Sequence, residues 1–180
     1  MGDLKVIEID TSTVVDEGEV QLVELIMRAI AEEIQAANFY MSAAYLYHGK
    51  QMEAIRNFFR NTFWDELNDH AAKLLERVTQ LVPDAVPSTS DFIGAVLDVS
   101  SFTGAYTKPV EISAQSEQGP DFELLLKTVD LENGSILTYN TMADLAVSLD
   151  DKVTEDIARD ILKDEEQHLK DVRDFIESIK

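Results

Sequence analysis

The chain has 180 residues, a length typical of one domain. It carries 15 Lys and Arg against 35 Asp and Glu, and this formal net charge of −20 repels nucleic-acid phosphates and anionic lipid headgroups while it attracts cations. The absence of cysteine excludes disulfides and thiolate metal sites. From the net charge we expect no nucleic-acid or membrane partner. A cytoplasmic location is also expected, because the opening MGDLKVIEID has no basic region leading into an apolar run.

The first half of the chain predicts two long helices. Residues 1–16 have β propensity but no evident partner strand, and we interpret them as an N-terminal arm. Apolar residues then recur with a helical period over residues 17–48, and Gly49 ends this helix. A second helix is expected over residues 51–82, closed by Pro83. The short turn between the two helices predicts antiparallel packing.

The second half predicts a long connection and two more helices. Residues 83–119 are rich in Ser, Thr, Pro and Gly and lack a long period, so they form the crossover. Pro120 opens a third helix, and Asp150 or Asp151 caps a fourth that runs almost to the end of the chain. The predicted fold is all-α: residues 17–180 form an antiparallel four-helix bundle with one long crossover.

The two halves of the chain form an internal repeat with an offset of 99 residues. Apolar residues with three- and four-residue spacing make a core stripe in the first and third helices, and one Glu with a Tyr seven residues later interrupts each stripe. The same offset relates two acidic pairs in the second and fourth helices, and in both halves 33 residues separate the single Glu from the Glu of the pair. The residues are Glu33, Tyr40, Asp65 and Glu66 in the first half, and Glu132, Tyr139, Asp164 and Glu165 in the second.

The repeated glutamates predict a metal site. The fourth helix also places His168 three residues after Glu165 on an otherwise apolar stripe. A single helical Glu is usually solvated, but four at matching core positions would be costly to bury without cations. Two divalent metal ions would neutralise them, and a Glu from two helices with a Glu-x-x-His pair from each of the others is the di-iron carboxylate arrangement. Tyr40 and Tyr139 are expected to be core aromatics, with a hydrogen bond to a metal carboxylate as a further role.

The segments AEEIQAANFY, DELNDHAAKLLERV, VDLENGSILTY and DEEQHLKDV make the chain resemble the ferritin-like superfamily, most closely bacterioferritins and related bacterial or archaeal ferritin-like proteins. The resemblance covers about residues 18–82 and 120–179. It implies that Glu33 and Glu132 are terminal ligands and that Glu66 and Glu165 bridge a pair of irons. It also implies that His168 holds one iron and that Asp65 and Asp164 orient ligands.

One expected ligand departs from the family motif. The motif places a His three residues after Glu66, where this chain has Asp69, with His70 one position further on. Either Asp69 substitutes as a carboxylate ligand, or an extra residue in a π-bulge brings His70 into place. The apolar residues beyond, Leu74 and Val78, continue the register of His70 and favour it.

The leading functional hypothesis is a ferroxidase that oxidises Fe(II) with dioxygen or hydrogen peroxide, with iron storage or detoxification as its outcome. The predicted catalytic residues are the four glutamates with Tyr40 and Tyr139, and the cofactors are two Fe ions per chain, or Mn. The alternatives are a di-iron oxidase, oxygenase or peroxidase acting on another substrate, and a non-catalytic bundle with a vestigial site. Haem is not expected, because Met52 is the nearest candidate ligand and suits the core. The sequence ends with the fourth predicted helix, which favours a homodimer or small homo-oligomer over a large cage.

Overall fold

Four long helical segments make up the computed structural model, which describes residues 17–47, 52–83 and 120–179. The second segment is one continuous helix in three parts, because a π-helical turn interrupts it. The elements are α1 (Glu17–Leu46), α2 (Glu53–Asp65), the π turn η3 (Glu66–His70), α3 (Ala71–Leu81), α5 (Pro120–Ser148) and α6 (Lys152–Ser178). None of the described residues forms a strand, and none of these helices is long and apolar enough to cross a membrane.

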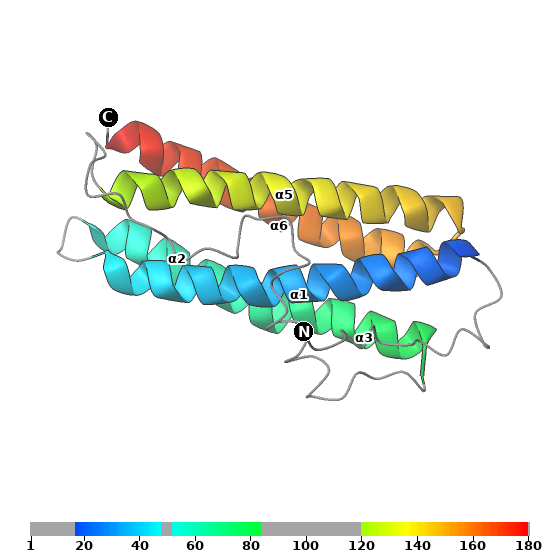
Figure 1. Cartoon of the computed structure of the whole chain (residues 1–180). Coiled ribbons are helices and arrows are strands. Elements are labelled where there is room, and N and C mark those ends of the chain that lie inside the picture. Colours follow the sequence, from blue (N-terminus) through cyan, green and yellow to red (C-terminus); the bar gives the residue numbers. More distant parts are fainter. Residues whose placement is uncertain (1–16, 48–51, 84–119, 180) are drawn as a thin grey trace, which may run out of the picture.

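The helices form an antiparallel bundle in two pairs (Figure 1). Helix α1 runs against the α2–η3–α3 segment, and α5 runs against α6, while α1 also packs on α5. Helix α3 ends and α5 begins at opposite ends of the bundle. This arrangement confirms the predicted all-α bundle. The expected arm, 1–16, and almost all of the expected crossover lie outside the described residues, so the domain limits stay predictions.

The core consists of two apolar clusters separated by a polar layer. One cluster includes Tyr40, Phe59 and Leu125, and the other includes Ile30 and Tyr139. Each buried large apolar side chain contributes about 1.5–3 kcal/mol. Between the clusters every helix segment presents buried acidic or imidazole side chains. The two clusters therefore offset the cost of burying this charged layer.

A tight turn joins α5 to α6 and contacts α3. Asp150 has a φ of 56°, in the left-handed region, and the Asp151 backbone N–H donates to the carbonyl of Ala146 at 2.9 Å. This is the Schellman pattern that ends many helices. The Asp151 carboxylate then caps α6 by accepting from the Thr154 backbone N–H at 3.0 Å. Because Arg77 of α3 donates to the same carboxylate at 2.7 Å, the turn is held against the neighbouring helix pair.

Candidate metal centre

Six buried acidic and imidazole side chains meet in the middle of the bundle. They come from all four helical segments, and none is more than 8% exposed. The set is Glu33 of α1, Glu66 and His70 of η3, Glu132 of α5, and Glu165 and His168 of α6. The structure thus brings together the four predicted glutamates and both candidate histidines.

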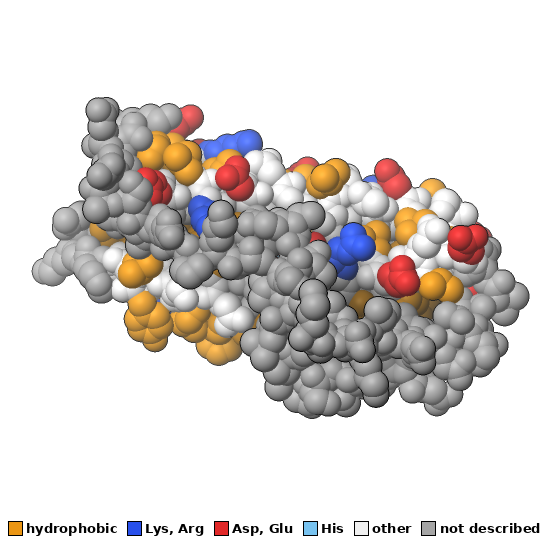
Figure 2. Space-filling model, viewed as in Figure 1, with side chains coloured by type: hydrophobic (Ala, Val, Ile, Leu, Met, Phe, Trp, Pro, Cys, Tyr) orange, Lys and Arg blue, Asp and Glu red, His pale blue; other side chains and the backbone are white. Residues whose placement is uncertain are grey.

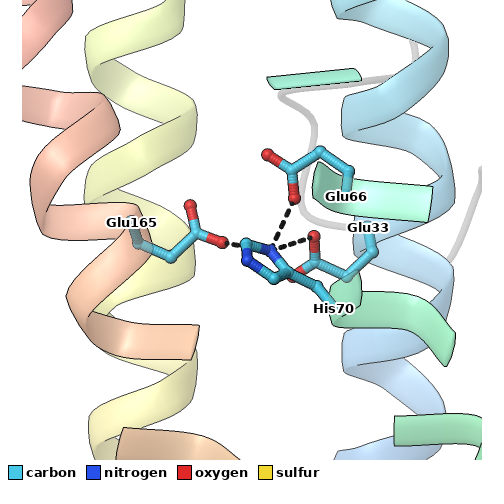
Figure 3. A group of neighbouring side chains, drawn as sticks. All are labelled: Glu33, Glu66, His70 and Glu165. Carbon is cyan, nitrogen blue, oxygen red and sulfur yellow. Dashed lines mark hydrogen bonds and ion pairs between the residues drawn. The ribbon is translucent and has the colours of Figure 1, made fainter. Parts of the chain in front are cut away.

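The six side chains divide into two groups that overlap. Within each group, one potential ligand atom per residue lies within 4.8 Å of the others. The first group is Glu33, Glu66, His70 and Glu165, shown in Figure 3, and the second is Glu66, Glu132, Glu165 and His168. Glu66 and Glu165 belong to both groups, so each offers one carboxylate to two adjacent positions. This is the geometry required of bridging ligands between two cations.

The π turn decides which side chain faces this cluster. The backbone N–H of Ala71 donates to the carbonyl of Glu66, five residues back, so η3 contains one more residue per turn than an α-helix. His70 is 0% exposed, and its Nδ1 lies 3.0 Å from an oxygen of Glu66. Asp69 lies at the partly exposed flank, where its carboxylate accepts from the Lys73 ammonium at 2.6 Å. The extra residue therefore directs the imidazole inward and the aspartate outward.

The two predicted tyrosines connect the halves of the bundle. Tyr40 of α1 donates a hydrogen bond to Glu132 of α5, and Tyr139 of α5 donates one to Glu33 of α1. Each tyrosine is at most 1% exposed, so these are buried contacts with a carboxylate. The sequence did not identify these partners, because each tyrosine bonds to the glutamate of the opposite half of the chain. The internal repeat was a signal for this exchange, because helices related by a two-fold axis can exchange contacts.

Each histidine presents one ring nitrogen to the glutamates and the other to an aspartate. The Nε2 of His70 lies 3.5 Å from Oδ2 of Asp164, and the Nε2 of His168 lies 3.7 Å from Oδ2 of Asp65. Their Nδ1 atoms face glutamate oxygens. A carboxylate behind a metal-binding imidazole commonly orients the ring. The positions of both aspartates fit the orienting role that the resemblance implies.

Burial and mutual repulsion perturb the ionisation of the carboxylates. Burial, followed by the charge of Glu165, raises the pKa of Glu66 and of Glu132 well above the usual range. Burial also acts to raise the pKa of Glu165, but the nearby imidazoles of His168 and His70 outweigh it and hold that pKa below the usual range. The metal-free layer thus retains protons on some carboxylates and concentrates negative charge on Glu165.

The surrounding carboxylates raise the pKa of both histidines. Burial lowers the pKa of His70, but the carboxylates of Glu165, Glu33 and Glu66 around its ring outweigh burial and raise that pKa above the ordinary value. Burial also lowers the pKa of His168, but the nearby carboxylates of Asp65 and Glu165 raise it overall to about 10. Protons on the imidazoles therefore act as the cations of the metal-free layer.

Several buried polar atoms of this layer lack a hydrogen-bond partner. They are one oxygen each of Glu33 and Glu132, both oxygens of Glu165 and Nδ1 of His168, whereas Nε2 of His70 faces Asp164. Buried polar atoms are normally paired, so unpaired atoms that converge indicate a missing ligand. Carboxylate oxygens with imidazole nitrogens form a donor set for iron or manganese. The residues present fit two divalent cations.

A bundle with a buried carboxylate–histidine layer drawn from all four helices defines the ferritin-like class of proteins. A family model described as "Ferritin-like domain" matches residues 23–180. The chain therefore belongs to the ferritin-like family. No curated protein matches the chain.

Solved structures share this fold at low sequence identity. A ferritin-like, diiron-carboxylate protein from Bacillus anthracis str. Ames is 20% identical, with a TM-score of 0.66 and coverage of 89% of this chain and 99% of that chain. A protein from Xanthomonas campestris pv. campestris is 14% identical, with a TM-score of 0.68 and coverage of 91% and 93%. Dps from Thermosynechococcus elongatus is also 14% identical, with a TM-score of 0.69 and coverage of 88% and 92%. At these identities the likeness establishes the fold.

Proposed function

We propose that the protein is a ferroxidase that binds two Fe(II) ions as substrate and transfers their electrons to dioxygen or hydrogen peroxide. The observation that carries this proposal is the pair of overlapping four-residue groups, which share Glu66 and Glu165. The proposed ligands are the four glutamates, His70 and His168, with Asp69 outside the set. Glu33 and Glu132 each contribute to one position only, which suits terminal ligands.

The charge of the layer supports two divalent ions. Four ionised glutamates carry four negative charges, and two Fe(II) ions balance them when both imidazoles are neutral. Binding therefore displaces the protons that the metal-free site holds on Glu66, Glu132 and the histidines. Tyr40 and Tyr139 fix the orientation of the terminal carboxylates through their hydrogen bonds. The proposed role of the chain is to hold two reducing ions side by side and exclude bulk water from them.

The electrons balance with either oxidant. Two Fe(II) ions release two electrons, which with two protons convert dioxygen to hydrogen peroxide, or hydrogen peroxide to two waters. The oxidised iron then stays in the site or leaves for storage. Mn(II) would fit the same ligands. An organic substrate is less well supported, because the pocket beside His168 is lined by aspartates, asparagines and a glutamine as well as by Phe58 and Phe175.

The test is a titration of metal-free protein with Fe(II) without oxygen, followed by addition of dioxygen or peroxide. We expect two tightly bound Fe(II) per chain and their oxidation within one turnover. Retention of only the two ions would indicate an oxidase, whereas continued uptake of many ions per chain would indicate storage. Bound Fe(II) that neither oxidant converts to Fe(III) faster than free Fe(II) would overturn the proposal.

Three other expectations from the sequence remain proposals. A homo-oligomer would cover some of the large apolar side chains that the described surface exposes, such as Tyr45 of α1 and Trp64 of α2, which are 72% and 58% exposed. On the face in Figure 2 the Lys and Arg side chains lie apart from one another among acidic ones, which gives no support to a nucleic-acid partner. The cytoplasmic location stays a prediction.

A further inference from the structure

Side chains do not completely fill the seam between α6 and the α2–η3–α3 segment. A hollow of about 500 Å³ lies between α2–η3 and α6, and a second of about 340 Å³ lies further along, between α3 and α6. Apolar side chains such as Phe58 and Ile157 form only part of their walls, and charged or amide side chains form much of the rest. Apolar packing is therefore incomplete along this seam.

Carboxylates line both hollows from both sides of the seam. Those on one side belong to the α2–η3–α3 segment and those on the other belong to α6, and their like charges repel one another. Lys73 and Lys163 form ion pairs within their own helical segments. Repulsion across the seam therefore favours its opening. The carboxylates include Asp65, Asp69 and Glu76 on one side and Asp156, Asp160 and Asp164 on the other.

Arg77 of α3 bridges the seam by bonding to the first residues of α6, at the end of the bundle where α3 ends and α6 begins (Figure 1). Its guanidinium donates to both oxygens of Asp151, at 2.8 and 2.7 Å, and to Oγ1 of Thr154 at 2.8 Å. The Arg77 and Asp151 side chains are 12% and 13% exposed, so solvent screens their contact less than it screens a surface ion pair. Arg77, Asp151 and Thr154 thus form a clamp across the seam, named the seam clamp below.

The seam clamp lies on the same faces of its helices as the proposed metal ligands. Arg77 follows His70 by seven residues, about two helical turns, and Thr154 precedes Glu165 by eleven residues, about three turns. Each interval is a whole number of turns, so both members of each pair project from one side of their helix. Helices α3 and α6 are continuous over these intervals. The seam clamp therefore sets the position of Glu165 relative to His70 through two uninterrupted helices.

We propose that Arg77 is a positioning residue for the metal centre, which holds α6 against α3 so that the glutamates and histidines of the two segments stay within reach of one metal pair. This role rests on the metal binding of the proposed function and not on the oxidation step. Without the seam clamp, repulsion opens the seam, and the centre binds cations only in the fraction of molecules that is closed. The apparent metal affinity then falls by that fraction, although every ligand is present.

The experiment measures Mn(II) affinity by electron paramagnetic resonance, at a temperature where circular dichroism shows every variant to be folded. Arg77→Gln should weaken Mn(II) binding about three- to tenfold, because the closed fraction of the metal-free protein falls. Loss of a positive charge from a chain of net charge −20 would by itself strengthen cation binding. Weaker binding by Arg77→Gln is therefore opposite to the effect of charge alone.

A second variant changes the other partner of the same contact. Asp151→Asn removes the carboxylate that Arg77 binds but keeps a side chain that caps helices well. It should weaken Mn(II) binding about threefold or more, although it alters the net charge in the opposite direction to Arg77→Gln. The double variant should bind within about twofold of Arg77→Gln alone, because the two changes break one contact and their effects do not add.

Two controls separate positioning from charge and from general stability. Arg159→Gln also removes an arginine, but the ion pair of Arg159 with Glu155 lies within α6, so Mn(II) affinity should stay within about twofold of the unaltered chain. Ile176→Val leaves a small cavity in the core near the last turn of α6 and lowers stability without touching the seam clamp. It should leave Mn(II) affinity unchanged in the folded protein.

The outcomes distinguish the positioning role from the proposed function. Equal Mn(II) affinity for Arg77→Gln and Arg159→Gln would overturn the positioning role, even if the protein oxidises iron. An equally large loss of affinity in Ile176→Val would overturn it too, because general stability would then explain the effect. Mn(II) binding that depends on Arg77 in a chain that does not oxidise Fe(II) would overturn the ferroxidase alone, and an unaltered chain that binds no Mn(II) would overturn both.

Discussion

His70 shows how one residue position governs the chemistry of the centre. The apolar register beyond it predicted an inward-facing ring, and the structure buries Leu74 and Val78 on the same side of the segment. The choice between Asp69 and His70 stayed open at the level of sequence, because a π turn has no composition signal of its own. The turn is visible only once the backbone hydrogen bond from Ala71 to Glu66 is known.

We expect His70→Ala to reduce the initial rate of oxidation at saturating Fe(II) at least about 10-fold, because the change removes one nitrogen donor from the first group. Asp69→Ala should leave that saturating rate near the wild-type value, because this carboxylate lies outside both inner groups. Stopped-flow absorbance of Fe(III) measures both variants. The opposite ranking would show that the aspartate, and not the imidazole, is the ligand.

The ionisation of the buried glutamates predicts how two isosteric variants differ. In the metal-free protein the pKa values of Glu66 and Glu132 are raised, so the fold favours their protonated side chains. Their contribution to the free energy of unfolding is therefore present at pH values below their ordinary pKa, and it is lost as the pH rises through their pKa in the folded protein. Glu165 has a lowered pKa, so its contribution is present above the ordinary pKa and is lost as the pH falls through the folded value. Glu66→Gln should therefore raise the Tm of metal-free protein near pH 8, whereas Glu165→Gln should lower it.

Calorimetry of both variants at about pH 5 and pH 8 checks this, and the gain from Glu66→Gln should shrink at the lower pH, where Glu66 retains its proton more fully. Both variants remove a ligand shared by the two groups. Each should consequently lose tight binding of the metal pair. A lower Tm for Glu66→Gln at pH 8 would contradict the assigned direction of the repulsion.

At the scale of the helices, periodicity and capping residues predicted most of the architecture. Pro120 begins α5 as expected, and Asp151, one of two candidate caps, is the residue whose side chain caps α6. The other candidate, Asp150, instead adopts the left-handed conformation that ends α5. Sequence alone could not assign these two roles, since both aspartates are favourable in either place. The antiparallel packing of α1 against the α2–α3 segment was predicted from the short stretch of sequence that separates the two helices.

Asp150→Gly should stabilise the protein by about 0.5–1 kcal/mol, because glycine has no Cβ to strain the left-handed conformation. Thermal unfolding should therefore show a higher Tm, by roughly 1–4 °C for a domain of this size. Asp144→Gly, at an exposed position inside α5, should have the opposite effect and cost about 0.3 kcal/mol, because glycine is a poorer helix former than aspartate. An unchanged or lower Tm for Asp150→Gly would mean that the charge at the start of α6 outweighs the strain.

At the scale of the whole molecule, the bundle and the buried layer followed from the repeat, because carboxylates at matching positions on two core stripes are costly to bury unless cations neutralise them. The contacts between the halves did not follow, since periodicity places a residue on a face but does not name its partner. The reciprocal bonds from Tyr40 and Tyr139 are of this kind. The connections at 48–51 and 84–119 lie outside the described residues.

The π turn also bears on the history of the chain. Glu66 and Glu165 stand 99 positions apart, but His70 and His168 stand 98 apart, and the apolar residues beyond them, Leu74 with Val172 and Val78 with Ile176, keep the spacing of 98. The two halves thus differ by one inserted or deleted residue, and η3 confines that difference to a single turn of helix. If the halves descend from one duplicated helical hairpin, the insertion or deletion fell between two proposed metal ligands, and the local widening of the helix kept both on the same face.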